Sequence, residues 1–340
     1  MEPEPSPIVQ APLGYLCYRA NTPVAIDGDL NDSAWANAPW SESFRDIEGD
    51  LKPDPPFRTR MKMLWDDRAL YIAAELEEPH IWATLRKHDS VIFHDNDFEV
   101  FLDPDADGHI YAELELNALN TTWDLLLVKP YKDGGPAIDA WEITGLQTAV
   151  RVRGTINDPK DRDEHWTVEI AWPWPGLREI ARCPVPPRNG DQWRINFSRV
   201  EWDHVVADGA YQKIPKRLEH NWVWSPQSVI DMHRPERWGV LQFSDAAPGS
   251  AILRSDPAQP ARDYLHRVYY AQKAHRKSTG RYHDSLAGLG DSGRLTSPRL
   301  SDPLLQTTPN GFEAMVTFSL PDGKRERWRI NHEAAITKVP

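Results

Sequence analysis

Residues 95–124, DNDFEVFLDPDADGHIYAELELNALNTTWD, contain two segments in which apolar and polar side chains alternate. The apolar positions are Phe98, Val100 and Leu102 in the first segment and Ala112, Leu114 and Leu116 in the second. A period of two predicts two strands joined by the acidic turn, each with one apolar and one polar face. The apolar faces need a partner, so a second layer of structure is expected.

The polar faces of these strands carry several carboxylates, an amide and two aromatic rings. Two interpretations remain open at this point. The face can be an ordinary solvated surface, which antiparallel sheets commonly have and which the pattern alone favours. It can also be a surface that hydrogen-bonds hydroxyl groups and offers rings for stacking.

Similar alternation recurs on both sides of this stretch and predicts about ten short strands in all. Besides the two strands above, the predicted strands are residues 15–19, 59–65, 70–76, 124–128, 146–156, 165–172, 193–202 and 239–243. A short helix is expected over residues 173–181, where proline comes early and apolar residues are spaced by three. No long helix separates the strands, which indicates a mainly β fold, an antiparallel β-sandwich.

The pattern changes after residue 245, which predicts a domain boundary. Residues 1–13 are expected to form a flexible leader, residues 14–245 the sandwich, residues 246–260 a linker and residues 261–340 a small C-terminal α+β appendage. The appendage should contain a helix over 262–279, a second short helix over 283–289, and a hairpin formed by 311–320 and 325–331.

Composition excludes some functions. The formal net charge of −12 argues against nucleic acid and anionic membranes as partners, and no apolar run is long enough to span a bilayer. The first ten residues do not form a signal peptide, so the chain is either cytoplasmic or has lost an export signal, in which case it is extracellular or periplasmic. Cys17 and Cys183 are too few for a disulfide framework; two free thiols or one bridge remain possible.

Six motifs occur in a recognisable order: AIDGDLNDSAW, MLWDDRALYIAAEL, DNDFEVFLDPD, HWTVEIAWPWPGL, WRINFSRVEW and PERWGVLQF. Over residues 20–244 this order resembles the family 9 carbohydrate-binding modules, and in particular the stand-alone family 9-like proteins. The resemblance implies a DOMON-type sandwich that binds sugars without catalysis, often in proteins tied to polysaccharide breakdown. It also implies structural calcium in some members.

The family clamps a sugar ring between two tryptophans and hydrogen-bonds it from neighbouring strands. Carried over by motif, the clamp positions are Phe93 and Met232, and the hydrogen-bonding positions are Glu99 and Glu115. Phe and Met replace the two tryptophans, and Glu115 stands where some members have a basic residue. Since a sugar site needs planar apolar surface and fixed donors and acceptors, further binding residues are expected. They are Asn117, Asn196, Arg199 and Trp224, and Trp123 or Trp222 could also supply a replacement ring for the clamp.

Calcium is a candidate cofactor at the acidic turn. Asp103, Asp105 and Asp107 supply hard oxygen ligands at alternate positions, as in the first half of a calcium loop. The twelfth position is Leu114, so the complete EF-hand pattern fails. An acidic hairpin turn without a metal is the alternative that the residues favour.

Two other functions remain as alternatives to sugar binding. Glycoside hydrolysis needs two carboxylates at a set separation, and Glu99, Glu113 and Glu115 could supply them. Haem binding, which related sandwiches perform through Met and His, has as candidate ligands Met61, Met63, His204, Met232 and His233. The adjacent Met232 and His233 should point to opposite faces of an extended segment, which disfavours haem.

Overall fold

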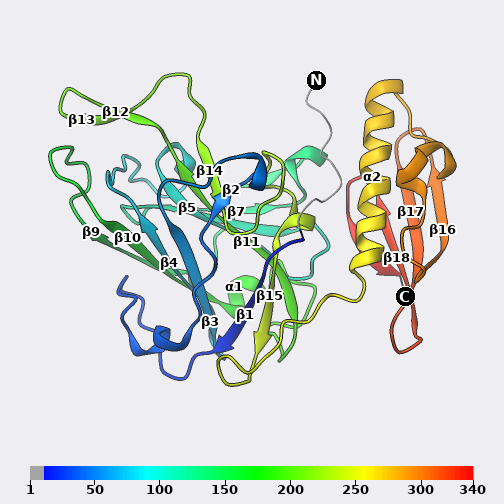
Figure 1. The fold of residues 1–340 in the computed structure, drawn as a ribbon, viewed down its shortest axis with the longest axis horizontal. Helices are drawn as coiled ribbons and strands as arrows, with labels where there is room; N and C mark the ends of the chain where they lie inside the picture. The colour runs from blue at the N-terminus through cyan, green and yellow to red at the C-terminus, as the bar shows by residue number, and fades with distance from the viewer. Residues whose placement is uncertain (1–10, 340) are drawn as a thin grey trace.

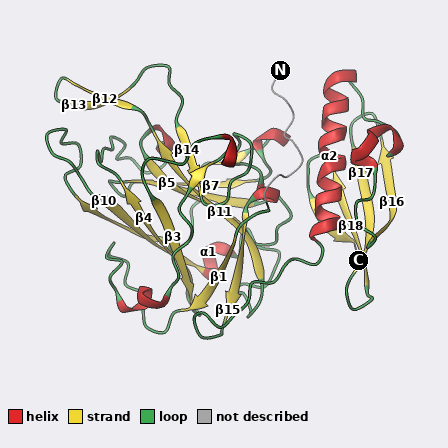
Figure 2. Cartoon of the chain, viewed as in Figure 1, coloured by secondary structure: helices red, strands yellow, loops and turns green. Residues whose placement is uncertain are grey.

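A computed structural model describes residues 11–339 of the chain. Residues 1–10 of the predicted leader lie outside the described residues. Figures 1 and 2 show a large body built from strands, followed by a smaller body that contains the long helix α2 (Gln259–Thr279) and a small sheet. Fold class is therefore as the sequence predicts, mainly β with a C-terminal α+β part.

Within the described residues, the large body contains fifteen strands, five more than predicted. They are β1 (Gly14–Arg19), β2 (Arg45–Asp46), β3 (Thr59–Trp65), β4 (Ala69–Glu77), β5 (Asp97–Asp103), β6 (Tyr111–Asn117), β7 (Thr122–Leu127), β8 (Ala137–Ile138), β9 (Gln147–Arg153), β10 (His165–Pro173), β11 (Gln192–Glu201), β12 (His204–Ala207), β13 (Ala210–Lys213), β14 (His220–Val223) and β15 (Gly239–Ser244). The additional strands, β2, β8, β12, β13 and β14, have two to four residues each, too short for a period-two pattern.

Helical turns are short in this body. The predicted helix over 173–181 is a single turn, α1 (Trp174–Leu177), and 3₁₀ turns cover Ser33–Asn37, Gly49–Leu51, Ile92–His94, Tyr131–Asp133 and Pro235–Arg237. All but β12 and β13 of the strands join one sheet, whose main path runs β8-β7-β6-β5-β11-β15-β1-β3-β4-β10-β9. Most neighbours are antiparallel, but β1 runs parallel to both β15 and β3.

The sheet curls so that its two limbs face each other across the core (Figure 1). Phe98 and Val100 of β5 belong to the same buried cluster as Met61 and Met63 of β3 and Ile72 of β4. Seven of the 15 tryptophans are among the largest fully buried side chains, so the high Trp content serves mainly the core. The apolar faces that the sequence predicts for β5 and β6 are therefore packed as expected.

The small body has its own buried cluster between α2 and a four-stranded sheet. The sheet runs β16 (Leu300–Thr307), β17 (Phe312–Ser319), β18 (Arg325–Asn331) and β19 (Ile336–Val339). Strands β17 and β18 are the predicted hairpin, while β16 and β19 extend it on both sides. Residues Ala287–Gly293 form a 3₁₀ segment in place of the predicted helix over 283–289.

The connecting segment between the two bodies has neither helix nor strand over residues 245–256, but it is held against the sandwich. The side chain of Gln242 accepts a hydrogen bond from Arg254 N–H and donates one to the Ile252 carbonyl, at 2.8 and 3.0 Å. Gln192 donates a further hydrogen bond to the Arg254 carbonyl. Part of this segment is therefore docked, although its composition resembles a free linker.

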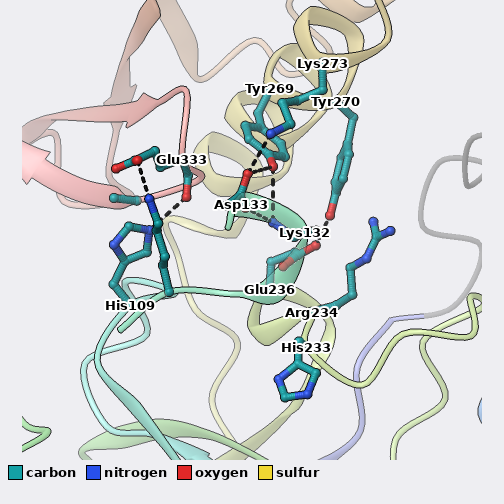
Figure 3. A network of polar contacts seen from close by, with 12 residues as sticks. His109, Lys132, Asp133, His233, Arg234, Glu236, Tyr269, Tyr270, Lys273 and Glu333 are labelled. Carbon is teal, nitrogen blue, oxygen red and sulfur yellow. Dashed lines mark hydrogen bonds and ion pairs between the residues drawn. The ribbon is translucent and has the colours of Figure 1, made fainter. Parts of the chain in front are cut away.

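A polar network joins α2 to two loops of the sandwich, residues 129–136 and 231–238 (Figure 3). Asp133 accepts hydrogen bonds from the Tyr269 hydroxyl at 2.5 Å and from Lys273 at 2.9 Å. The neighbouring Tyr270 donates its hydroxyl hydrogen to the carboxylate of Glu236. The helix thus braces both loops at once.

Two smaller expectations are settled by the structure. Cys17 and Cys183 are both free thiols, so the alternative of one bridge is wrong. Among residues 11–339, no helix is both long and apolar enough to cross a membrane.

The Glu236 contact predicts a pH-dependent contribution to stability. Burial alone would raise the pKa of Glu236, but the charge of Lys132 and the hydrogen bond from Tyr270 help to lower it to about 2. Because an unfolded Glu titrates at about 4.3, this group stabilises the fold above that pH and stops doing so as the pH falls towards 2. Relative to the wild type, Glu236→Gln should lower the free energy of unfolding by about 1–3 kcal/mol at pH 7 and by less at pH 3, as measured by urea unfolding.

Glu313→Gln is the matched control, because Glu313 forms a half-exposed ion pair with Arg329 at 3.4 Å within the small body. The free energy of unfolding of Glu313→Gln should stay within about 1 kcal/mol of the wild-type value at both pH 7 and pH 3. An equal loss for Glu236→Gln at pH 7 and pH 3 would show that its ionisation does not stabilise the interface.

The domain boundary near residue 245 remains a prediction that limited proteolysis can test. Cleavage within 246–256 should leave a soluble folded fragment that ends near Asp245, since the sandwich has a core of its own. Docking of Ile252 and Arg254 should direct the first cuts to the exposed residues 246–250. An insoluble fragment, or the absence of any cut in this segment, would mean that the two bodies form one cooperative unit.

Candidate functional site

Strand pairing gathers the acidic side chains of β5 and β6 on one face of the sheet. Glu99 lies directly opposite Glu115. Two residues away along the same pair of strands, Glu113 lies opposite Phe101. Asp97 shares this face because it is two residues before Glu99. One carboxylate oxygen from each of Asp97, Glu99 and Glu115 comes within 4.8 Å of the others.

This acidic face is buried, which corrects the expectation that Glu99 and Glu115 lie on a solvated surface. Their exposed fractions are 4% and 2%, and that of Glu113 is 4%. Loops from other parts of the chain, including residues 92–94, 131–133 and 230–233, close over the strands and border the cleft there. The alternating pattern reports the faces of a strand but not the loops that cover them.

Burial changes the protonation of these acids. Loss of water raises the pKa of Glu99 to about 7, and it raises the pKa values of Asp97, Glu113 and Glu115 well above their ordinary range. Repulsion between neighbouring carboxylates adds to the effect for Asp97, Glu113 and Glu115. Among the described residues that line the cleft, none is Lys or Arg. At neutral pH the cluster therefore holds protons that isolated carboxylates would have released.

A cleft of about 260 Å³ opens over these acids. Its walls carry aromatic rings and polar groups in addition to the acidic floor. The rings are those of Phe93, Phe101, Trp123 and Tyr131; the polar and sulfur-bearing wall residues include Glu219, Asn221, Asp231, Met232 and His233. A concave site with apolar rings and a few converging polar groups is the usual form of a small-molecule site.

Local contacts hold the wall residues in position. The backbone N–H of Phe93 donates a hydrogen bond to Glu115 at 2.8 Å, which ties the 3₁₀ turn Ile92–His94 to β6. The indole N–H of Trp123 donates to Asp139 at 2.6 Å. Nδ1 of His233 lies 2.9 Å from the Tyr111 hydroxyl, and its ring is 4.5 Å from the Tyr131 ring.

His233 stays neutral at ordinary pH, since burial lowers its pKa to about 4. The loop that carries Met232 and His233 continues into Arg234 and Glu236, which lie under helix α2 (Figure 3). Tyr131 likewise precedes Lys132 and Asp133 of the same network. Helix α2 therefore supports two of the loops that form the cleft wall.

Four of the eight residues predicted to bind sugar lie at this cleft: Phe93, Glu99, Glu115 and Met232. The other four do not line it. Asn117 donates to the Leu85 carbonyl and to Asp95, and it accepts from Leu119 and Thr121 N–H groups, so it fixes a turn. Asn196 bonds the backbone of Ser225 in both directions, at 2.9 and 3.0 Å.

Arg199 and Trp224 lie on the core side of the sheet, away from the cleft. Arg199 follows Ser198 in β11 and points to the core side, where it pairs with Glu78 at 2.6 Å and Glu201 at 2.8 Å. Trp224 is fully buried, and a Cβ at Gly239 would come within 2.2 Å of its ring. The contacts of both side chains are therefore made inside the fold and not in the cleft.

Sequence reasoning did not assign Tyr131 and His233 to the sugar site, and it offered Trp123 only as a replacement ring for the clamp. The position of Trp123 could be predicted from the alternating pattern, because Trp123 lies opposite Glu115 in the next strand and on the same face of the sheet. Tyr131 and His233 lie in loops, where no repeating pattern indicates which way a side chain points. Only the fold brings them to the strands.

The acidic turn at Asp103, Asp105 and Asp107 brings three carboxylates together within 4.8 Å. Asp103 accepts hydrogen bonds from the N–H groups of Ala106 and Gly108, and Arg182 pairs with Asp107 at 3.0 Å. The turn is thus held by backbone donors and one guanidinium. Calcium binding there stays a prediction.

The proposed haem ligands are dispersed. Met61 and Met63 lie in the core between the sheet limbs, and the His204 ring meets the His80 ring edge-on at the start of the β12–β13 hairpin. Met232 and His233 both line the cleft, because the segment bends at Met232 and is not an extended strand. The sulfur of Met232 already accepts a hydrogen bond from Gln227, and these residues do not form an axial pair.

Comparison with known proteins relates the chain to carbohydrate-binding modules. A family model described as carbohydrate family 9 binding domain-like matches residues 26–185. A search of curated proteins found no match.

Among solved structures, a candidate carbohydrate-binding protein from Bacteroides uniformis aligns with a TM-score of 0.51 at 14% identity, covering 68% of this chain and 99% of that one. A family 9 module from Caldicellulosiruptor kristjanssonii in complex with cellotriose aligns with a TM-score of 0.44 at 17% identity, covering 71% of this chain and all of that one. Its glucose complex gives the same TM-score and identity with 70% of this chain covered.

The family match spans β5, β6 and β7, the strands that form the acidic floor and carry Trp123. The Bacteroides structure independently supports the sandwich fold. Residues 26–185 therefore match the carbohydrate family 9 binding domain-like family, within a sandwich of the same fold.

Proposed function

We propose that the protein binds an uncharged sugar in the cleft over β5 and β6 and does not cleave it. The observation that carries the proposal is the buried acidic floor beneath aromatic walls, within a family 9-like domain. This combination offers hydrogen bonds to hydroxyl groups and flat apolar surface to the C–H faces of a sugar ring.

The protonation of the floor suits an uncharged polyol. A carboxyl group that keeps its proton can donate one hydrogen bond and accept others, as a sugar hydroxyl can. The pKa values of Glu99, Glu113 and Glu115 are all raised by burial, so such groups are present near neutral pH. An anionic ligand would meet these acids and Asp231 without a compensating cation in the wall.

The aromatic contacts that support stacking differ from the Phe and Met clamp predicted from sequence. Trp123 and Tyr131 join Phe93 in the wall, and Trp123 lies directly across from Glu115. A sugar ring stacked on Trp123 would therefore be within reach of the acidic floor. About 260 Å³ is close to the lower end of small-molecule sites, roughly 300 Å³, which favours a monosaccharide or the end of a longer chain.

A secreted or periplasmic role in polysaccharide catabolism forms part of the same proposal. Its support is the family 9 match and the acidic charge of the chain, which disfavours nucleic acid as a partner. Glu99 and Glu115 as a hydrolytic pair is the weaker alternative. A hydrolytic pair needs one carboxylate that stays ionised, whereas burial raises the pKa of both Glu99 and Glu115.

Trp123→Ala and Tyr131→Ala should each weaken sugar binding by about 1–2 kcal/mol, five- to thirtyfold, because each removes ring surface from the wall. Isothermal titration calorimetry against a glycan panel that includes glucose and cellotriose would measure this effect. Trp40→Ala is the control, since Trp40 packs under Arg60 and Lys62 and does not line the cleft.

Unchanged affinity in both cleft variants would place the sugar elsewhere. Release of reducing sugar by the wild type, lost in Glu99→Gln, would instead support the hydrolytic alternative.

The acidic floor also predicts how stability depends on pH. The raised pKa of Glu99, about 7, means that the folded chain binds a proton which the unfolded chain releases above about 4.3. The free energy of unfolding should therefore fall as the pH rises from 5 to 9. Glu99→Gln should flatten this dependence and be more stable than the wild type at pH 9, as measured by urea unfolding.

Glu77→Gln, a change on an exposed residue at the end of β4, should leave the pH profile unchanged. A wild-type profile that rises from pH 5 to 9 would show that the floor is ionised in the folded protein.

A further inference from the structure

Opposite the cleft, on the other face of β7, a histidine faces several carboxylates. Trp123 and Asp124 are consecutive in this strand, so their side chains point to opposite faces. Nε2 of His88 lies 3.1 Å from Glu142, 3.3 Å from Asp89 and 3.8 Å from Asp124. Ligand atoms of His88, Asp124 and Glu142 all lie within 4.8 Å of one another.

The backbone determines which nitrogen of His88 is available. Nδ1 lies 2.9 Å from the carbonyl oxygen of Thr122, an acceptor, so Nδ1 carries a hydrogen. Nε2 then presents either a lone pair or a second hydrogen to the carboxylates. Nε2 lies within hydrogen-bond distance of both carboxylate oxygens of Glu142, at 3.1 and 3.2 Å. A histidine that donates from Nδ1 to a backbone carbonyl and directs Nε2 at carboxylates has the arrangement found at metal sites.

The acids around Nε2 lack the positive charge that they need. Asp124 is 1% exposed, and although its Oδ2 accepts the Ile143 N–H at 2.6 Å, its Oδ1 has no hydrogen-bond partner. Oδ1 of Asp89 is also buried without a hydrogen bond, and its near neighbour is Nε2 of His88 at 3.3 Å. Even a doubly protonated His88 would leave this group of carboxylates with excess negative charge. An unpaired buried carboxylate oxygen is costly, so an additional cation would be stabilising.

We propose that His88, Asp124 and Glu142, with Asp89 beside them, form a binding site for a divalent transition cation such as Zn²⁺ or Mn²⁺. One imidazole nitrogen combined with carboxylate oxygens suits these ions, whereas Ca²⁺ prefers oxygen ligands alone. The side chains of His88 and Glu142 are 45% and 63% exposed, which gives a cation a path to the buried Asp124. The proposal does not depend on sugar binding, because these residues do not line the cleft.

The experiment uses the full chain after treatment with a chelator, with Zn²⁺, Mn²⁺ and Ca²⁺ added separately. One equivalent of Zn²⁺ or Mn²⁺ should bind in calorimetry, and a hundredfold excess over Kd should raise the melting temperature by about 5–10 °C. His88→Ala and Glu142→Gln should each weaken binding by about tenfold or more. His220→Ala is the matched control, since its Nε2 faces Asp203 at 3.3 Å but Arg217 already supplies positive charge there.

Several results would overturn the proposal: no binding of Zn²⁺ or Mn²⁺, equal binding in the His88→Ala and Glu142→Gln variants, or protection by Ca²⁺ alone. Histidine NMR of the wild type provides a test that needs no variant. Zn²⁺ should shift the Nε2 resonance of His88, and a Zn²⁺-induced shift confined to other histidines would place the ion elsewhere.

Discussion

Burial of several carboxyl groups without a basic partner is the constraint around which the sandwich is arranged. Asp97, Glu99, Glu113 and Glu115 lie on one face of β5 and β6 and are nearly inaccessible to water. Transfer of an ionised carboxylate from water is too costly to be sustained, so these groups keep protons instead. The loops above them must then supply shape and hydrogen bonds rather than charge, as the aromatic wall and the neutral His233 do.

The loops over the acidic floor are supported from outside the sandwich. Helix α2 contacts residues 129–136 through Asp133 and residues 231–238 through Glu236 (Figure 3). The same loops place Tyr131 and His233 in the cleft wall. Binding residues on loops are effective when a rigid scaffold positions them, and here the scaffold includes the C-terminal body. A separate appendage thus contributes to the geometry of a site to which it supplies no side chain.

Strand β7 serves two sites because adjacent side chains of a strand point in opposite directions. Trp123 faces the cleft, while Asp124 faces His88 and the segment that contains Glu142. That segment also holds Trp123, through the hydrogen bond from its indole to Asp139. The conformation of residues 139–143 therefore helps to fix the position of the Trp123 ring in the cleft wall. The two sites nevertheless differ in chemistry: protonated acids under aromatic rings on one face, and a histidine with unpaired acid oxygens on the other.

The sequence by itself determined the ten longer strands of the sandwich, the helix predicted over 262–279 and the likeness to family 9. Period-two and helical patterns are local, and an order of motifs can be recognised without knowledge of the contacts. It also identified Glu99, Glu115, Phe93 and Met232 as residues that prove to line one cleft. Only the tertiary structure decided their environment. Asn196 and Arg199 have the right chemistry for a sugar, but Ser225 and Glu78, distant in the chain, engage them. Whether a carboxylate is solvated or buried depends on loops from elsewhere, and burial, not residue type, sets its protonation.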